Sequence, residues 1–242
     1  MTYAVLNTVL VEMKQNLLIV GTSVTAQSIN KYVEDYNLFN LLGFLVDKEY
    51  KTCDTYYDKP VYTFDKLPSE FDKDKDFLFI AMEWDKLNAT RRKMFNRLKS
   101  EGYHLANIIS PHAIIHGKII GENCWICDNV VIENDAIIYD DNFLKTGVIV
   151  QHLSVIESHC FVGARTIMAG GVHIGEQSYI GIGAIIFNSV NIGKKCLVGG
   201  ATYVKRHLPP FSVIKTKSDE FIIKQYDEDE IENKLLASIK IR

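Results

Sequence analysis

An aliphatic side chain recurs at every sixth position over a long stretch of the chain, and this period constrains the fold more than any other feature. The position two residues later serves as a control, because Ile182 is its only aliphatic member. A helix does not repeat every six residues. The seventeen positions of the series all hold Ile, Leu, Val or Met and are Ile108, Ile114, Ile120, Ile126, Ile132, Ile138, Leu144, Val150, Ile156, Val162, Met168, Ile174, Ile180, Ile186, Ile192, Val198 and Val204.

Small residues occupy the positions between these aliphatics. The fourth residue after each aliphatic is mostly small. The residue directly after each aliphatic is often glycine, as at Gly121, Gly163 and Gly181. Because glycine adopts positive φ at little cost, we interpret these glycines as corners between short strands. Hexapeptide periodicity is typical of a β-helix, and the repeat predicts about five to six coils.

The first part of the chain follows a different pattern. Buried strands are expected at residues 16–20, 41–46 and 77–82, with helices reaching about residue 36 and spanning 86–101. Alternating strands and helices predict a small parallel, Rossmann-like α/β sheet. We therefore expect an α/β domain at 1–105, a β-helix at 106–208 and a C-terminal cap or tail at 209–242. Residues 1–13 are expected to add a strand or helix, and 227–242 a charged helix.

Composition excludes several classes of function. The net charge of −3 and a pI near 6.2 argue against a nucleic-acid partner. The N-terminus lacks the basic region of a signal peptide, and no apolar run is long enough for an integral membrane segment, so a cytoplasmic protein is expected. Cys124 and Cys127 form a lone C-x-x-C, but Cys124, Cys160 and Cys196 share one small-residue position of the repeat. We interpret them as buried, and expect no metal site.

The first turn of the α/β domain reads "GTSVTA", residues 21–26, with one glycine instead of the three of a dinucleotide fingerprint. NAD binding is therefore disfavoured. Thr22 and Ser23 at the helix start can hold a phosphate, or Ser23 can simply cap the helix. Asp47 follows the second strand and is well placed to meet a ribose or a sugar.

Stacking the repeat at 18 residues places His152 between Asn134 below and Gly170 above. An imidazole titrates near working pH, which suits a general base. Asn134 is a candidate to orient His152. His159 lies over Asp141, and this pair has three open interpretations: a structural hydrogen bond, an auxiliary catalytic pair, or a contact between subunits.

The succession of an α/β domain and a hexapeptide coil, with "VQH" at 150–152 and "LVGGATYVK" at 197–205, resembles sugar acyltransferases of the sialic acid O-acetyltransferase type and their relatives that acetylate UDP-linked 4-amino sugars. The resemblance covers residues 16–210. It implies a left-handed, three-sided coil, a homotrimer, acetyl-CoA as co-substrate, and a nucleotide-linked sugar held by the N-terminal domain, in surface glycan synthesis.

The resemblance also implies roles for single residues. His152 matches the general base and Gly170 the glycine whose amide faces the thioester. The matches to the CoA arm and the terminal stretch are Ile182, Gly199, Gly200, Ala201 and Lys205. The matches to the nucleotide and acceptor side are Gly21, Thr22, Ser23, Asp47, Lys145 and Leu153.

Leu153 stands where many relatives carry Asp or Glu, and Lys145 where an Asn is common. Leu153 is either an ordinary exposed leucine or is covered by a neighbouring subunit or pocket. Two other functions stay open from the sequence. One is a non-catalytic β-helix that binds a nucleotide sugar or scaffolds a complex, and the other is an acyltransferase acting on a small acceptor that is not a sugar.

Overall fold

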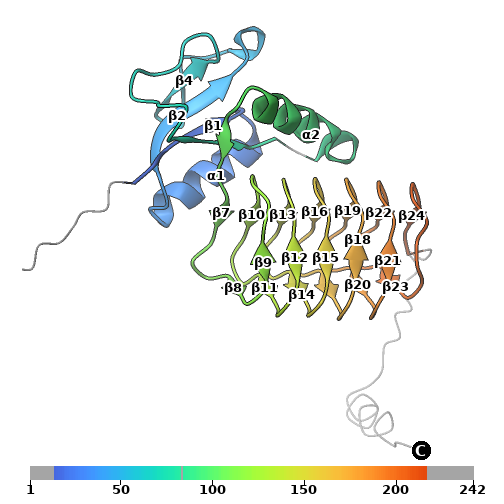
Figure 1. Cartoon of the computed structure of the whole chain (residues 1–242). Coiled ribbons are helices and arrows are strands. Elements are labelled where there is room, and N and C mark those ends of the chain that lie inside the picture. The colour runs from blue at the N-terminus through green and yellow to red at the C-terminus, as the bar shows by residue number, and fades with distance from the viewer. Residues whose placement is uncertain (1–13, 83, 217–242) are drawn as a thin grey trace, which may run out of the picture.

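The computed structural model describes residues 14–82 and 84–216. The elements expected for residues 1–13 and 227–242 lie outside these ranges. Figure 1 shows an α/β domain seated on one side of a regular coil of short strands, with the coil axis running away from it. The predicted succession of an α/β domain and a parallel β-helix is confirmed.

The α/β domain has a parallel sheet with one antiparallel edge strand, in the order β3-β4-β2-β1-β5-β6. The strands predicted at 16–20, 41–46 and 77–82 are all present within one or two residues. They are apolar because helices cover the sheet and bury β1 almost completely. The elements are β1 (Asn16–Val20), α1 (Val24–Asp35), β2 (Asn40–Val46), the 3₁₀ helix η1 (Lys48–Tyr50), β3 (Thr55–Tyr56), β4 (Lys59–Thr63), β5 (Phe77–Ile80), α2 (Asp85–Ser100) and β6 (His104–Leu105).

Three parallel sheets of two-residue strands form the sides of the coil. The first sheet contains β7 (Ile108–Ile109), β10 (Trp125–Ile126), β13 (Phe143–Leu144), β16 (Phe161–Val162), β19 (Tyr179–Ile180), β22 (Leu197–Val198) and β24 (Val213–Ile214). The second contains β8 (Ile114–Ile115), β11 (Val131–Ile132), β14 (Ile149–Val150), β17 (Ile167–Met168), β20 (Ile185–Ile186) and β23 (Tyr203–Val204). The third contains β9 (Lys118–Ile119), β12 (Ile137–Ile138), β15 (Val155–Ile156), β18 (His173–Ile174) and β21 (Asn191–Ile192).

We call the bend from the first to the second sheet the first corner, from the second to the third the second corner, and from the third back to the first the third corner. Residues 145–148, 151–154 and 157–160 are one example of each. Strand β24 pairs with β22, so the coil continues past residue 208, where the boundary was expected. Pro209 and Pro210 lie within this last turn.

The six-residue series fills the interior of the coil from Ile126 to Val204, where all fourteen of its members are fully buried. The prediction is wrong for the first coil. Ile114 and Ile120 are exposed, and Ile109, Ile115 and Ile119 pair with the interior residues of the next coil instead. The spacing between paired residues of the first and second coils departs from 18, because one corner of the first coil is shorter and the next is longer. The six-residue period alone does not show these corner lengths.

The corner glycines serve a purpose different from the one expected. None of the glycines that directly follow an aliphatic of the series has positive φ. A Cβ on Gly121 would lie 2.2 Å from the backbone nitrogen of Asp140 in the next coil, so close stacking excludes a side chain. Positive φ falls instead on the third residue after each member of the series from Ile120 to Val198, at all fourteen positions from Asn123 to Ala201. This explains why Asn, Asp and Gly are frequent there.

Aromatic residues on the outer face of the first sheet join the two parts. Phe143 stacks on Phe79 of β5 with ring centroids 5.9 Å apart, and Trp125 meets Tyr32 of α1 edge to face at 5.6 Å. The α/β domain therefore covers the part of the first sheet around β10 and β13, while β24 at the far end and the second sheet stay bare (Figure 1).

Candidate active site

His152 lies at the second corner, between β14 and β15, at the edge of the bare second sheet. Val150 points into the coil and anchors the corner from inside. Leu153 follows with φ of 57°, so the chain turns sharply immediately after the histidine. The His152 side chain consequently projects outward, and 57 % of it is exposed.

A carboxylate from the coil below faces His152. Oε2 of Glu133 lies 3.5 Å from Nδ1 of His152 and accepts a hydrogen bond of 3.2 Å from the His152 backbone N–H. Both side chains are partly exposed. The ring nitrogen that faces the acid is thus Nδ1, which leaves Nε2 as the nitrogen available to a substrate.

Gly170 lies against the other end of the ring, one coil above. A Cβ on Gly170 would be 2.4 Å from Nε2 of His152, so a side chain there and the observed ring position exclude one another. Within residues 14–82 and 84–216, the Gly170 backbone N–H has no hydrogen-bond acceptor. An unused amide beside Nε2 is the kind of group that can stabilise a developing oxyanion.

Asn134 does not take the orienting position expected for it. Its backbone oxygen accepts the N–H of Leu153 at 3.2 Å, and its exposed side chain has no hydrogen bond to His152. The carboxylate of Glu133 occupies that place instead. Stacking at 18 residues does not identify this contact, because Glu133 and His152 are 19 residues apart on adjacent coils.

His159 is held in a buried network at the third corner, far from solvent. Its Nδ1 is 2.8 Å from Oδ2 of Asp141, and Nε of Arg91 donates to Oδ1 of the same carboxylate at 2.9 Å. Asn88 donates to the His159 carbonyl at 2.8 Å, and Phe95 packs edge to face on the imidazole. Helix α2 buries the pair, whose side chains are 7 % and 0 % exposed, so the imidazole is not presented to a substrate in this structure.

The residues matched to the CoA arm fall on two different corners. Gly170 and Lys205 share the second corner with His152. Ile182 and Gly200 stack at the first corner, where Ile182 is 64 % exposed. Gly199 and Ala201 belong to that same corner. The second sheet separates the two groups of residues, so a single chain does not bring them together.

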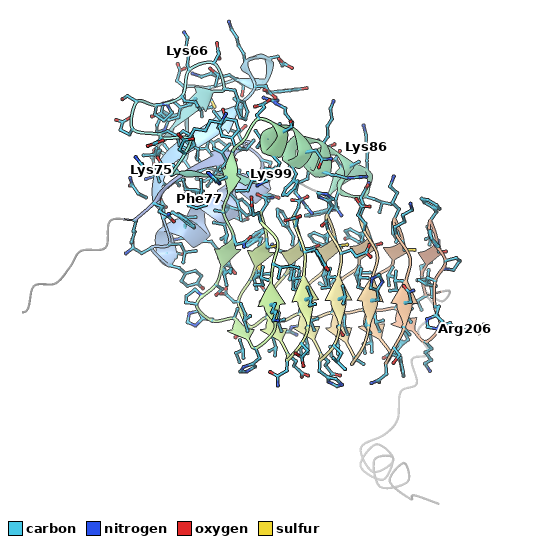
Figure 2. All side chains as sticks on the ribbon, in the orientation of Figure 1. Lys66, Lys75, Phe77, Lys86, Lys99 and Arg206 are labelled. Atoms are coloured by element: carbon cyan, nitrogen blue, oxygen red, sulfur yellow. The ribbon has the colours of Figure 1, made fainter. Side chains whose placement is uncertain are left out.

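A basic pocket lies on the second corner near the far end of the coil. Its volume is about 430 Å³. Figure 2 shows Arg206 at that end, away from the α/β domain. Arg206 is three coils above His152, which corresponds to roughly 14 Å at the usual strand spacing. The lining residues are Tyr203, Lys205, Arg206, His207, Leu208 and Ile214.

The predicted nucleotide segment is at the carboxyl edge of the α/β sheet. Gly21 has φ of 110°, as a tight turn after β1 requires. Ser23 caps α1 by accepting the N–H of Ala26 and donates to the Ala81 carbonyl at 2.9 Å, so its capping role is the one observed. Thr22 is half-buried beside it. Asp47 is already paired, because Arg97 of α2 donates to it at 2.7 Å.

Lys145 lies at the first corner, one corner before His152. Its Nζ is 3.2 Å from the centroid of the Trp125 ring, and burial lowers its pKa below the usual range. Lys145 packs beneath the α/β domain near Cys127 and is not brought to His152. Burial raises the pKa of the Cys124 thiol to about 12 and raises that of Cys127, so burial disfavours the thiolate at both positions.

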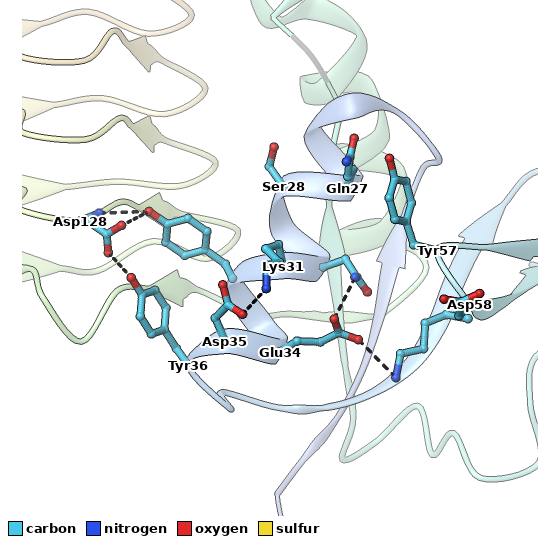
Figure 3. Close-up of a pocket in the computed structure, with 12 residues that line it drawn as sticks. Gln27, Ser28, Lys31, Glu34, Asp35, Tyr36, Tyr57, Asp58 and Asp128 are labelled. Atoms are coloured by element: carbon cyan, nitrogen blue, oxygen red, sulfur yellow. Dashed lines mark hydrogen bonds and ion pairs between the residues drawn. The ribbon is translucent and has the colours of Figure 1, made fainter.

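A second cavity, larger than the basic pocket, lies away from His152. It has a volume of about 830 Å³ and opens between α1, the turn of β3 and β4, and Asp128 (Figure 3). Its walls combine tyrosine, amide and hydroxyl side chains with two ion pairs, Lys31 with Asp35 and Lys59 with Glu34. Throughout the described ranges, no three His, Cys, Asp or Glu side chains are grouped to hold a metal ion. Neither α-helix described is long and apolar enough to cross a bilayer.

Comparison with known proteins supports this architecture. A family model described as the hexapeptide repeat of succinyl-transferase matches residues 155–188 and 171–206. No protein of curated function matches the sequence. The acetyltransferase domain of PglB from Neisseria gonorrhoeae superimposes with a TM-score of 0.71 at 19 % identity, covering 82 % of this chain and 95 % of that domain.

Two further solved structures agree over the same length. The GDP-perosamine N-acetyltransferase from Caulobacter crescentus, solved with CoA and GDP-perosamine, gives a TM-score of 0.72 at 24 % identity and covers 82 % of this chain and 92 % of that one. WeeI from Acinetobacter baumannii gives 0.69 at 21 % identity, covering 82 % and 95 %. The chain therefore shares with these proteins a fold of an α/β domain followed by hexapeptide-repeat coils.

Proposed function

We propose that this chain transfers an acetyl group from acetyl-CoA to an amine of a nucleotide-linked sugar. The observation that carries the proposal is the position of His152, whose Nε2 is free and lies beside the unused amide of Gly170. The solved Caulobacter protein of the same fold, described as an N-acetyltransferase, contains CoA and GDP-perosamine, which favours an amine over a hydroxyl as acceptor.

In this mechanism Nε2 of neutral His152 accepts a proton from the acceptor nitrogen as that nitrogen attacks the thioester carbonyl carbon. The new C–N bond forms and the C–S bond breaks. The CoA sulfur leaves as a thiolate and receives a proton from the imidazolium. The amide of Gly170 donates to the carbonyl oxygen while it carries negative charge.

The corner above His152 suits a long donor. Lys205 and Arg206 provide positive charge about three coils away. The coil directly above His152 has small residues at this corner, Ala169, Gly170 and Gly171, and the coil after it presents Phe187, which is 40 % exposed. Phosphates bound at the basic pocket would let an extended arm run along the corner toward Nε2. The fit rests on charge and spacing, since Lys and Arg are the residues that bind phosphate.

We infer a homotrimer from the division of the matched residues between two corners. The bare second sheet lies between His152 and Ile182, and its outer face carries Ile114, Ile167 and Tyr203. Packing this face on a neighbouring chain would bury apolar side chains and bring one chain's first corner to another's second corner. The nucleotide would be held at the turn after β1, where Gly21 and Thr22 remain accessible.

The proposal includes a place in surface glycan synthesis, as the family resemblance implies, and a cytoplasmic location. The competing function is a coil that binds a nucleotide sugar without catalysis. The two differ in whether the protein binds acetyl-CoA and consumes it.

The test combines calorimetry with two histidine variants. Acetyl-CoA should bind, and His152→Ala should lower turnover by roughly 10²- to 10⁴-fold without abolishing that binding. His173→Ala is the matched control, because His173 also pairs with a glutamate, Glu157, at 3.1 Å on the coil surface. No heat of binding at millimolar acetyl-CoA would exclude the enzyme and favour the non-catalytic function.

A further inference from the structure

We propose that Glu133 is a positioning residue for His152 and supplies, from the coil below, the carboxylate that the corner itself lacks. The inference rests on the proposed role of His152 as base. It assigns Glu133 to holding the imidazole with its proton on Nδ1, so that Nε2 carries the lone pair.

The contact between the two residues is made by a single oxygen. Oε2 of Glu133 accepts the His152 backbone N–H at 3.2 Å and lies 3.5 Å from Nδ1 of the same residue. The backbone contact fixes the carboxylate beside the ring. A separation of 3.5 Å is an ion-pair distance, longer than a good hydrogen bond, and catalytic contacts often shorten when substrate binds.

Each nitrogen of the His152 ring therefore has its own neighbour. Glu133 faces Nδ1 from below, and Gly170 leaves room for Nε2 above. In a neutral imidazole only one nitrogen carries the proton, and a carboxylate near Nδ1 favours the proton there. Among residues 14–82 and 84–216, Glu133 is the one acidic group in an ion pair with His152.

The corner cannot provide this acid by itself. The residue after His152 is Leu153, which is 63 % exposed and has φ of 57°. The residue in line below is Asn134, whose side chain has no hydrogen bond to His152. The side chain of Glu133 crosses diagonally from the preceding position, and it leaves Leu153 free to present an apolar surface beside the base.

A purely structural role for Glu133 has a close parallel in the same coil. Glu157 accepts the backbone N–H of Glu176 at 2.8 Å, and these two residues are also 19 apart. Such a contact satisfies a corner amide whether or not a histidine is present. The experiment must therefore separate capping of the amide from action on the imidazole.

Glu133→Gln separates these roles, because glutamine keeps an oxygen to accept the His152 N–H but carries no charge. In full-length protein, the nitrogen chemical shifts of the His152 imidazole should show less of the Nδ1–H form. Glu157→Gln is the matched control and should leave the His152 shifts unchanged.

Kinetics provide the second readout. Without a carboxylate to hold the proton on Nδ1, kcat/KM should fall about 10-fold, less than for a buried triad carboxylate because Glu133 is partly exposed. An unchanged His152 tautomer in Glu133→Gln would overturn the inference. Because NMR needs no turnover, that outcome is distinct from failure of acetyl transfer itself.

Discussion

The imidazole of His152 fills the space that a side chain at position 170 would need, since a Cβ on Gly170 would lie 2.4 Å from Nε2. Gly170→Ala should therefore displace the ring and lower kcat/KM by about 10² or more, as expected when a base is misplaced by about 1 Å. Thermal unfolding should change little, because His152 is largely exposed and can rotate away.

A double-mutant cycle provides the control for this prediction. In a His152→Ala background, adding Gly170→Ala should cost little more, because the ring it displaces is gone. Additive losses in the two variants would show that Gly170 acts on the substrates rather than through His152.

Leu153 is strained as well as exposed. Its φ of 57° suits Asn, so Leu153→Asn should raise the free energy of unfolding by about 1 kcal/mol, measured by urea denaturation. Ile182→Asn is the control, because Ile182 is equally exposed and does not have positive φ. A loss of stability in Leu153→Asn would indicate that a neighbouring chain covers this leucine.

Arg91 and Arg92 are neighbours in α2. Arg91 forms a buried ion pair and Arg92 a partly exposed one. Arg91 pairs with Asp141 at full burial, so Arg91→Met leaves a buried carboxylate without its cation and should cost about 3 kcal/mol. Arg92 pairs with Glu176 on the surface, and Arg92→Met should cost less than about 1 kcal/mol. If chemical denaturation showed equal losses of unfolding free energy in Arg91→Met and Arg92→Met, the buried network would not join the two domains.

The lowered pKa of Asp128 predicts that the stability of the protein depends on pH. Burial tends to raise its pKa, but hydrogen bonds from Ser110, Tyr32 and Tyr36 outweigh burial and hold the pKa below its usual value. A lowered carboxyl pKa gives stability that is present above the unfolded value of about 3.9 and is lost as pH falls below it. Melting temperatures measured across this range should fall less steeply for Asp128→Asn. Asp135→Asn, at an exposed corner, should follow the wild type.

The oligomeric state of variants tests whether the bare second sheet is the contact between chains of the proposed trimer. Ile167 is 37 % exposed on its outer face, and Ile167→Lys should convert the proposed trimer to monomer in sedimentation, with loss of activity. Tyr139 is 38 % exposed at the third corner, and Tyr139→Lys should leave the assembly intact. A monomeric wild type would refute the shared site between chains.

The order of domains, the strands around Leu18 and Phe79, and the interior residues from Ile126 to Val204 were all predictable from the sequence. Periodicity is a local property, and a side chain's position in the repeat decides whether it faces the interior. His152 was placed on an outward corner for the same reason. The first coil departed because Ile114 and Ile120 lie where corner lengths change, and strand pairing settles that register.

Only the tertiary structure decided which groups meet across coils and corners. The period places Asn134 beneath His152, yet the carboxylate that reaches the ring belongs to Glu133, because side-chain direction at a corner depends on the turn as well as the register. Burial of His159 required helix α2, which comes from a distant part of the chain. By itself the sequence determined the coil and its outward positions. Three-dimensional packing decided which of those positions can act together, because contacts between coils and domains depend on distances that no repeat encodes.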